Sequence, residues 1–181
     1  FLSDDQLVTS GRTSGSVVVW DVVSNEPLAM ASGHGNSVAA LAFDPKGEKL
    51  YSGDSFGNIR VWGVPNGEPI RSFVLPGSDP EISDSFLASF ALTPTANEMA
   101  VYSRNGALRI VDSASGDIRS VIAGPDQSWP GYAFIAQGEE ILLASTDGTV
   151  GSMDWRKNAL GSVRPRKVGD GTVFAVAPGG K

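Results

Sequence analysis

The sequence contains no cysteine and only one histidine, and both shortages narrow what the protein can do. Without cysteine there is no disulfide, no thiolate nucleophile and no cysteine-based metal site. A single imidazole at His34, with no P-loop, dinucleotide fingerprint or metal-ligand spacing, predicts no active site, no cofactor and no bound metal. The lack of cysteine also fits an intracellular protein.

Long apolar runs are absent as well. No run approaches the roughly 18 residues of a membrane-spanning helix, so we expect no membrane segment. The N-terminal stretch FLSDDQLVTSG has neither the basic start nor the apolar block of a signal peptide, which predicts a protein that is not secreted. The chain opens with Phe1 rather than methionine, and we expect it to be an excised piece of a longer chain.

Basic side chains are scarce in residues 1–155, and acidic side chains are scarce in residues 156–181. Residues 1–155 carry 8 basic and 19 acidic side chains, whereas residues 156–181 carry 6 basic and 1 acidic. The overall net charge of −6 argues against general nucleic-acid binding. The basic segment, which we expect to surround an outer strand, is either a patch for RNA or another anionic partner or a solvated edge that deters strand pairing. Its residues are Arg156, Lys157, Arg164, Arg166 and Lys167.

The sequence consists mainly of short runs in which apolar and polar residues alternate, separated by turn residues. Residues 33–62 contain three of them, at 38–43, 50–52 and 59–62, with turns at 44–47 and 55–58, and a fourth run follows at 69–75. Alternation with a period of two predicts antiparallel strands joined in sequence. No stretch of useful length has the helical period, so the predicted class is all-β.

The pattern recurs through the chain with one spacing. The residues that end each third strand are 42, 49 and 42 residues apart; they are Trp20, Trp62, Val111 and Met153. The glycines of the turn before that strand and the residues of the turn after it keep the same spacing; they are Gly15, Gly57, Gly106 and Gly148, then Asn25, Gly67, Gly116 and Asn158. A fourth series has a further interval of 42 residues and consists of Phe1, Phe43, Leu92, Phe134 and Val176. A period of about 40–45 residues is typical of propeller repeats.

Glycine and asparagine in these turns predict backbone with positive φ, as two-residue hairpin turns require. Asn105-Gly106 and Asp147-Gly148 are the strongest such signals. The extra length of the 49-residue interval falls near residues 77–85, GSDPEISDS, which we expect to be a surface loop.

These landmarks resemble the WD40 repeat. Its marks are a Gly-His pair, an Asp-Pro-x-Gly turn and a closing Trp-Asp, which stand here as Gly33-His34, residues 44–47 and Trp62-Gly63. The resemblance implies a β-propeller of four-stranded antiparallel blades. We expect residues 1–181 to supply about four blades of a larger ring, with repeat landmarks at 1–42, 43–91, 92–133, 134–175 and 176–181.

The resemblance also implies that each sequence repeat straddles two blades. A four-bladed ring could then close by pairing residues 171–177 with the strand at Leu7–Ser10, although an arc cut from a longer chain is the preferred interpretation. In the repeat alignment Leu7, Val8 and Ser10 stand where Lys49, Leu50 and Ser52 stand later.

A buried network of His, Ser or Thr, Asp and Trp is a further feature of the family. The matching positions are His34, Ser52 and Trp62, which predicts a structural role for this histidine. The Asp position holds Phe56, so the network is expected to lack its acceptor, because Asp54 lies outside the register. Elsewhere Trp20 is expected in the core, and only Asp147 matches the Asp position.

Partners of this family often bind the face that holds the loops before the first strands and the turns between second and third strands. Trp129, beside Pro130, is therefore either a peptide anchor or a core residue. The equivalent second-to-third-strand turns hold Arg12, Ser55, Arg104 and Thr146, which are either contacts for an acidic partner or solvated turn residues.

The resemblance implies a non-catalytic scaffold that binds other proteins or peptides within a multi-protein complex. One alternative is a propeller subunit of an RNA-processing or ribosome-assembly complex, which only the basic C-terminal segment suggests. Another is an enzymatic propeller that uses the central channel, which a single histidine disfavours.

Overall fold

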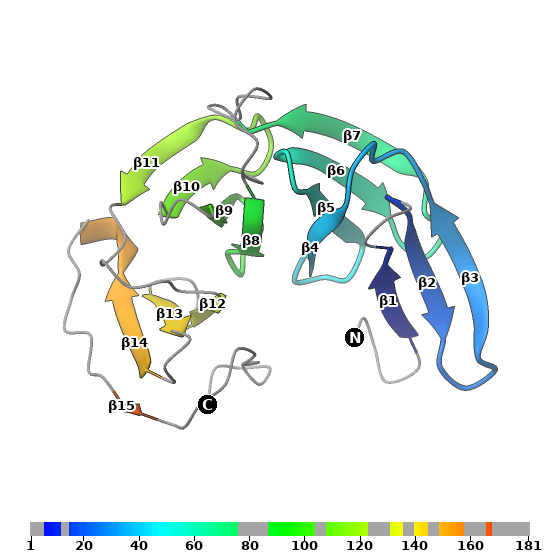
Figure 1. The fold of residues 1–181 in the computed structure, drawn as a ribbon, viewed down its shortest axis with the longest axis horizontal. Coiled ribbons are helices and arrows are strands. Elements are labelled where there is room, and N and C mark those ends of the chain that lie inside the picture. Colours follow the sequence, from blue (N-terminus) through cyan, green and yellow to red (C-terminus); the bar gives the residue numbers. More distant parts are fainter. Residues whose placement is uncertain are drawn as a thin grey trace. The chain divides into compact units, whose positions relative to one another are not determined.

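The protein is built from short antiparallel strands, as the computed structural model in Figure 1 shows. The structure describes residues 6–11, 15–75, 87–103, 108–122, 131–135, 140–144, 149–157 and 166–167. Within these residues the only helix is a single 3-10 turn, Trp155–Lys157. The predicted all-β class, with four-stranded antiparallel sheets of the propeller-blade type, is confirmed. The chain divides into two compact units, residues 1–87 and 88–181.

The first unit contains two sheets. One has the order β1-β2-β3 and the other has the order β4-β5-β6-β7. Their bounds are β1 Gln6–Ser10, β2 Val17–Asp21, β3 Glu26–Ala31, β4 Val38–Phe43, β5 Lys49–Asp54, β6 Asn58–Gly63 and β7 Pro69–Val74. Each strand pairs antiparallel with the next, as expected for alternating runs joined by short turns.

The second unit contains two four-stranded sheets of the same kind, β8-β9-β10-β11 and β12-β13-β14-β15. Their bounds are β8 Leu87–Leu92, β9 Glu98–Ser103, β10 Leu108–Asp112, β11 Ile118–Ile122, β12 Gly131–Ile135, β13 Glu140–Ala144, β14 Thr149–Asp154 and β15 Arg166–Lys167. One expectation is corrected here. Arg166 and Lys167 do not flank the last outer strand but form it, by pairing with Val150 and Thr149 of β14.

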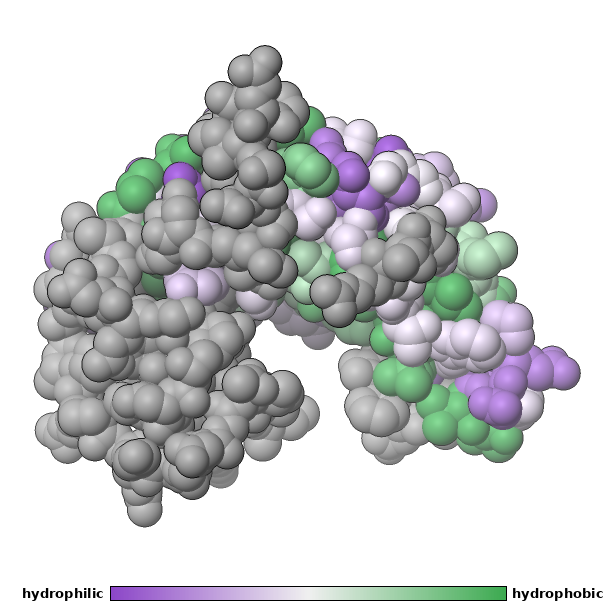
Figure 2. All heavy atoms as spheres, in the orientation of Figure 1, coloured by the Kyte–Doolittle hydropathy of each residue, from purple (hydrophilic) through white to green (hydrophobic). Residues whose placement is uncertain are grey.

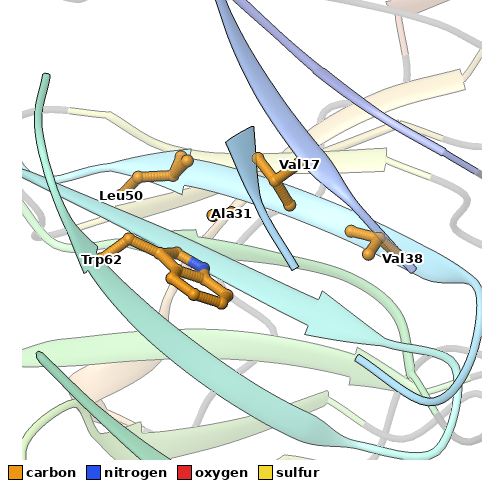
Figure 3. Close-up of a cluster of buried hydrophobic side chains, with 5 residues drawn as sticks. All are labelled: Val17, Ala31, Val38, Leu50 and Trp62. Atoms are coloured by element: carbon orange, nitrogen blue, oxygen red, sulfur yellow. The ribbon is translucent and has the colours of Figure 1, made fainter. Parts of the chain in front are cut away.

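The core of the first unit lies between its two sheets. Trp62, Leu50 and Val38 point from β6, β5 and β4 toward Val17 of β2 and Ala31 of β3, and all five are buried (Figure 3). Alternation explains this set, because one face of each strand meets the neighbouring sheet while the other points away. The alternating runs in the sequence therefore place their apolar faces as predicted.

The repeat turns have the predicted backbone but not the predicted length. Positive φ values occur at Gly15, Gly57, Asn25, Gly67 and Gly116. However, three residues separate β5 from β6, and longer loops separate β6 from β7 and β10 from β11. The expectation of two-residue turns is therefore wrong at these positions. In the β5–β6 turn, the N–H of Gly57 donates to the carbonyl of Asp54, and the glycine then takes the left-handed conformation.

The first strand is shifted by one residue from the repeat alignment. Leu7 pairs with Trp20 and Thr9 pairs with Val18, whereas in the next sheet Leu50 pairs with Trp62 and Ser52 with Arg60. Thr9, not Ser10, therefore occupies the place of Ser52. The reason is that eight residues lie between the paired Thr9 and Val18, whereas seven lie between the paired Ser52 and Arg60. The constant spacing of the turn glycines conceals this extra residue.

Several expectations lie outside the described residues. They concern the loop at 77–85, the turns at Asn105-Gly106 and Asp147-Gly148, Asn158, and the strand at 171–177 that would close a four-bladed ring.

Candidate functional site

Four side chains form a buried hydrogen-bonded chain in the second sheet. The indole N–H of Trp62 donates to Ser52 Oγ at 2.7 Å, and Ser52 Oγ lies 2.7 Å from His34 Nε2. On the other side of the imidazole, Nδ1 lies 3.4 Å from Asp54 Oδ2. Ser52 and Asp54 have no exposed surface, and the rings of His34 and Trp62 meet edge to face with 6.4 Å between centroids. The structure thus brings His34, Ser52 and Trp62 together.

The expectation that this network lacks an acidic acceptor is wrong. Phe56 does hold the position where the repeat pattern has Asp, but Asp54 supplies the carboxylate from two residues earlier. Asp54 Oδ1 also accepts from the backbone N–H groups of Phe56 and Asn58, each at 3.0 Å. The Asn58 amide donates to both carboxylate oxygens, at 3.0 and 2.8 Å. The turn folds back over Asp54, which is why an out-of-register residue can reach the histidine.

The chemistry of the groups fixes the direction of each hydrogen bond. An ionised carboxylate only accepts and an indole N–H only donates, so His34 Nδ1 donates to Asp54 and Trp62 donates to Ser52. In the neutral imidazole Nε2 is then an acceptor, and the Ser52 hydroxyl donates to it. Each polar side-chain atom of Trp62, Ser52, His34 and Asp54 thus has a hydrogen-bond partner. Ser52 is fully buried, so its hydroxyl is out of reach of a substrate, and the arrangement acts as a structural clamp.

The electrostatics of Asp54 make this clamp sensitive to acid. Burial raises the pKa of Asp54, but hydrogen bonds from His34, from Asn58 and from the backbone N–H of Phe56 together hold the pKa below its ordinary value of 3.8. A carboxyl whose pKa is lower in the folded state stabilises that state when ionised. This stabilisation is complete above the unfolded pKa and is lost as the pH falls through the folded pKa.

We therefore expect the free energy of unfolding to fall as the pH is lowered below about 4, the ordinary pKa of an unfolded aspartate. Urea unfolding between pH 3 and pH 6 measures this dependence. In Asp54→Asn the fall should be shallower, because the contribution of this buried carboxylate is gone. An unchanged pH dependence in that variant would show that Asp54 is not the group responsible.

The turn that caps this network is anchored by backbone hydrogen bonds and presents an aromatic side chain. The N–H of Ser55 donates to the carbonyl of Ser37 at 2.9 Å, and the carbonyl of Ser55 accepts from Leu87 at 3.3 Å. The carbonyl of Gly57 accepts from Leu75 at 3.0 Å. Phe56 stands between these anchored residues with 36% of its surface exposed. In the repeat pattern, Phe56 stands out only because it replaces an aspartate. Sequence reasoning did not name it as a contact residue, although an aromatic side chain in a turn is typical of protein-binding sites.

Three loops of the first unit gather at this end of the strands. An atom added to Gly15, in the β1–β2 loop, would lie 3.0 Å or less from the backbone of His34, in the loop before β4. That loop in turn is bonded to the β5–β6 turn through Ser37 and Ser55. The expectation that such loops share a face is therefore met within the described part of this unit.

The other sheets have simpler versions of the network. In the first sheet, the Trp20 indole N–H donates to Thr9 Oγ1 at 2.8 Å, but Thr9 is exposed and Trp20 is only half-buried, so the expectation of Trp20 in the core is wrong. In the third sheet the places of Leu50, Ser52 and Trp62 are taken by Met99, Val101 and Val111, all fully buried. Apolar packing there replaces the hydrogen bonds.

The Asp residues at the ends of β2, β10 and β14 stabilise the turn that follows each strand. Asp21 Oδ1 accepts from the backbone N–H groups two and three residues later, both at 2.8 Å, and Asp112 and Asp154 do the same. Hydrogen bonding to Arg119 holds the pKa of Asp112 well below its usual range. Gly63 replaces the Asp in the second sheet. There the residue two places on is Pro65, which has no N–H to offer such an Asp.

Several predicted contact residues cannot be placed. Arg12, Arg104, Trp129, Pro130, Thr146, Asp147 and Arg164 lie outside the described residues. Ser55 is half-buried, and Arg166 and Lys167 are placed only as backbone of β15.

Among the residues that are described, no three His, Asp or Glu side chains gather as a metal site. In the same part of the chain, no helix is long and apolar enough to cross a membrane.

Comparison with known proteins agrees with this geometry. Residues 25–63 match the family described as "WD domain, G-beta repeat". The match runs from the turn before β3 to the end of β6, so the sequence repeat straddles two sheets, as predicted.

Three relatives illustrate the similarity. The chain is 33% identical over 69 residues to pre-mRNA-processing factor 19 of Bos taurus, covering 38% of this chain and 14% of that protein. It is 33% identical over 67 residues to autophagy-related protein 18 of Schizosaccharomyces pombe, covering 36% and 18%. It is 28% identical over 108 residues to a WD repeat-containing protein 91 homolog of Dictyostelium discoideum, covering 56% and 14%. The matched segments thus span less than a fifth of each relative. Residues 25–63, with their Gly-His pair and their buried Trp62–Ser52–His34 network, thus carry a WD40 repeat.

Proposed function

We propose that this chain is a non-catalytic scaffold that binds another protein through the turn end of its sheets. The observation that carries the proposal is the β5–β6 turn, in which Phe56 is exposed while the residues on both sides are bonded to neighbouring loops. An aromatic held in place before binding loses little conformational freedom on association, so more of its buried area contributes to affinity.

The polar groups of the turn support the same role. The Phe56 N–H is already satisfied by Asp54, and Ser55 is bonded at both its N–H and its carbonyl. A partner that covers this turn therefore does not bury unpaired backbone groups, which would cost about 1–3 kcal/mol each. The surface offers an apolar contact with little desolvation cost.

The names of similar proteins support a role for such a scaffold within a multi-protein complex. One similar protein is named as subunit 5 of transcription initiation factor TFIID in Caenorhabditis elegans, to which 55 residues of this chain are 36% identical. A subunit by that name works in an assembly. We propose by analogy that this chain is an intracellular protein, that it contributes part of a larger propeller and that it acts within a multi-protein complex.

A photo-crosslinker tests the proposal. With p-benzoyl-L-phenylalanine at position 56, we expect crosslinks to one or a few proteins in cells, and Phe56→Ser introduced as a competitor should reduce them less than the native chain does. The matched control carries the same group at Val23, which is 79% exposed but lies in the β2–β3 turn at the other end of the strands. Equal crosslinking at both positions, or none at position 56, would contradict the proposal.

An alternative function is RNA binding, which two observations favour. The similarity to a protein named as a pre-mRNA-processing factor and the basic segment at 156–167 favour contact with RNA. In that case, neutralising Arg164, Arg166 and Lys167 should weaken binding of a single-stranded RNA oligonucleotide and flatten its salt dependence, by roughly 0.7 in slope for each phosphate that is no longer neutralised. No RNA binding by the native chain at low salt would remove this alternative.

A further inference from the structure

The guanidinium of Arg60 has no acceptor among the residues that the structure describes. Arg60 stands in the middle of β6 and is half-buried, but no hydrogen bond or ion pair joins it to another described residue. A guanidinium cannot lose its proton in a protein, so it carries its charge into this half-buried place. Charged groups that are removed from water are normally paired. The unpaired donors of Arg60 therefore indicate an acceptor from another molecule.

The third sheet shows what an arginine at this position does when an acceptor is within reach. Arg109 holds the same place in β10 as Arg60 in β6, and its guanidinium donates to Ser103 Oγ at 2.7 Å. In the second sheet the residue equivalent to Ser103 is Asp54. The carboxylate of Asp54 already accepts from the histidine and from the β5–β6 turn. The second sheet thus has the same cation but leaves its donors without an acceptor.

Two contacts hold the guanidinium of Arg60 in place. Its Cζ lies 5.9 Å from the centroid of the Trp62 ring, which is a cation–π contact. An added Cβ at Gly33 would lie 2.9 Å from Nη1, 3.0 Å from Cζ and 3.4 Å from Nη2 of Arg60. These similar distances mean that the flat face of the guanidinium covers Gly33, in space that a side chain there would fill. Packing therefore uses the face of the group and leaves its N–H edge for hydrogen bonds.

Ser72 places a second polar group beside Arg60. The two residues pair across β6 and β7, and directly paired residues have their side chains on the same face of a sheet. Ser72 is exposed, and within the described residues its hydroxyl has no partner either. Val74 follows on the same face of β7 and is 59% exposed. Hydrophilic and apolar residues are visible together on the surface around β7 (Figures 1 and 2).

We propose that Arg60, Ser72 and Val74 form a contact site for an acidic side chain, Asp or Glu, in an extended segment of a partner protein. The planar N–H edge of a guanidinium matches the two oxygens of a carboxylate. The Ser72 hydroxyl donates to the same carboxylate, and Val74 contacts an apolar neighbour in the segment. The site uses no atom of the Phe56 turn, so it does not depend on the function proposed for that turn.

The charge of the first unit favours a carboxylate over a phosphate. Residues 1–87 carry 11 acidic and 5 basic side chains. A phosphorylated side chain brings about −1.5 to −2 charges, which one arginine in an acidic unit does not balance. A carboxylate brings a single charge, and one guanidinium is enough to pair with it.

Two peptides that differ in one side chain test the proposal. The probes are Ac-Thr-Val-Glu-Val-Thr-NH2 and the same peptide with Gln in place of Glu. Each is added to the isotope-labelled 181-residue chain while the Arg60 Nε–H signal is followed by NMR. We expect the Glu peptide to shift this signal and to bind at least about tenfold more tightly than the Gln peptide, because a hydrogen bond between charged groups is stronger than one to a neutral amide.

Two variants show whether the guanidinium is responsible. Arg60→Lys keeps the charge but loses the planar N–H edge, so it should bind the Glu peptide several-fold more weakly. Lys49→Gln removes an exposed cation at the start of β5 in the same sheet and should leave the binding unchanged. The comparison of the two peptides on the native chain holds even if the Arg60 variant does not fold.

Four results would overturn the proposal. They are equal binding of the two peptides to the native chain, no binding of the Glu peptide, native binding by a folded Arg60→Lys variant, and an equal loss in Lys49→Gln. Inorganic phosphate is the remaining probe. If it shifts the Arg60 signal at lower concentration than the Glu peptide does, the site takes a phosphate and the assignment to a carboxylate is wrong.

Discussion

Replacing Gly15 with alanine is expected to destabilise the first unit by about 3 kcal/mol or more. An added Cβ would lie 2.2 Å from the carbonyl oxygen of His34 and 3.1 Å from that of Asn36. The φ of Gly15 is 60°, a conformation that costs a residue with a side chain about 1–2 kcal/mol, and the overlap with rigid backbone adds a similar amount. The midpoint of urea unfolding measures the loss.

Gly35→Ala is the matched control, because no heavy atom lies within 4 Å of its added Cβ and its φ is not positive. Gly35 is the neighbour of His34 in sequence, so both variants place a methyl group near His34. They differ in the room for that methyl group and in the backbone conformation. We expect Gly35→Ala to unfold near the native midpoint. Similar losses in both variants would show that the approach of Gly15 to His34 does not hold the two sheets together.

Replacing Asp54 with alanine is expected to cost about 3 kcal/mol of stability. The substitution removes the acceptor for His34 Nδ1, for the Asn58 amide and for the backbone N–H groups of Phe56 and Asn58. Leaving buried donors unsatisfied costs about 1–3 kcal/mol each, partly offset where water can enter the exposed turn. Thermal unfolding followed by circular dichroism measures the loss.

The control for Asp54 is Asp21→Ala. Asp21 also accepts two backbone N–H groups in a turn, but the turn is exposed and water can replace the carboxylate. Its loss should cost much less than that of Asp54. A second variant asks whether a carboxylate in the usual repeat position can take over: Asp54→Ser combined with Phe56→Asp should recover part of the stability. Equal effects of Asp54→Ala and Asp21→Ala would mean that burial of the network contributes nothing.

Both substitutions act on the same junction. Gly15 lies against the backbone of His34, and the side chain of His34 contacts Asp54. A first-sheet loop, the loop before β4 and the β5–β6 turn are therefore joined through one residue. Because the Phe56 turn is part of this junction, loss of the clamp should also loosen the proposed contact surface, and the crosslinking at position 56 should weaken in Asp54→Ala.

The sequence by itself determined the class, the repeat and most strand positions. Strand runs follow from alternation, which depends only on neighbouring residues, and the turn glycines follow from the φ values that only glycine and asparagine adopt readily. The Gly-His and Trp landmarks were enough to predict the resemblance to the WD40 repeat and to group His34, Ser52 and Trp62. These features are local or periodic, so a linear pattern can reveal them.

Only the tertiary structure decided how those elements meet. It assigned the acceptor role to Asp54, because a folded-back turn brings that carboxylate to His34 from outside the repeat register. It placed Thr9 rather than Ser10 against Trp20, since one extra loop residue is invisible in glycine spacing. It also separated covered Trp62 from half-buried Trp20, two residues with the same local sequence pattern. Burial depends on which sheet lies opposite, and no repeat pattern within a strand contains that information.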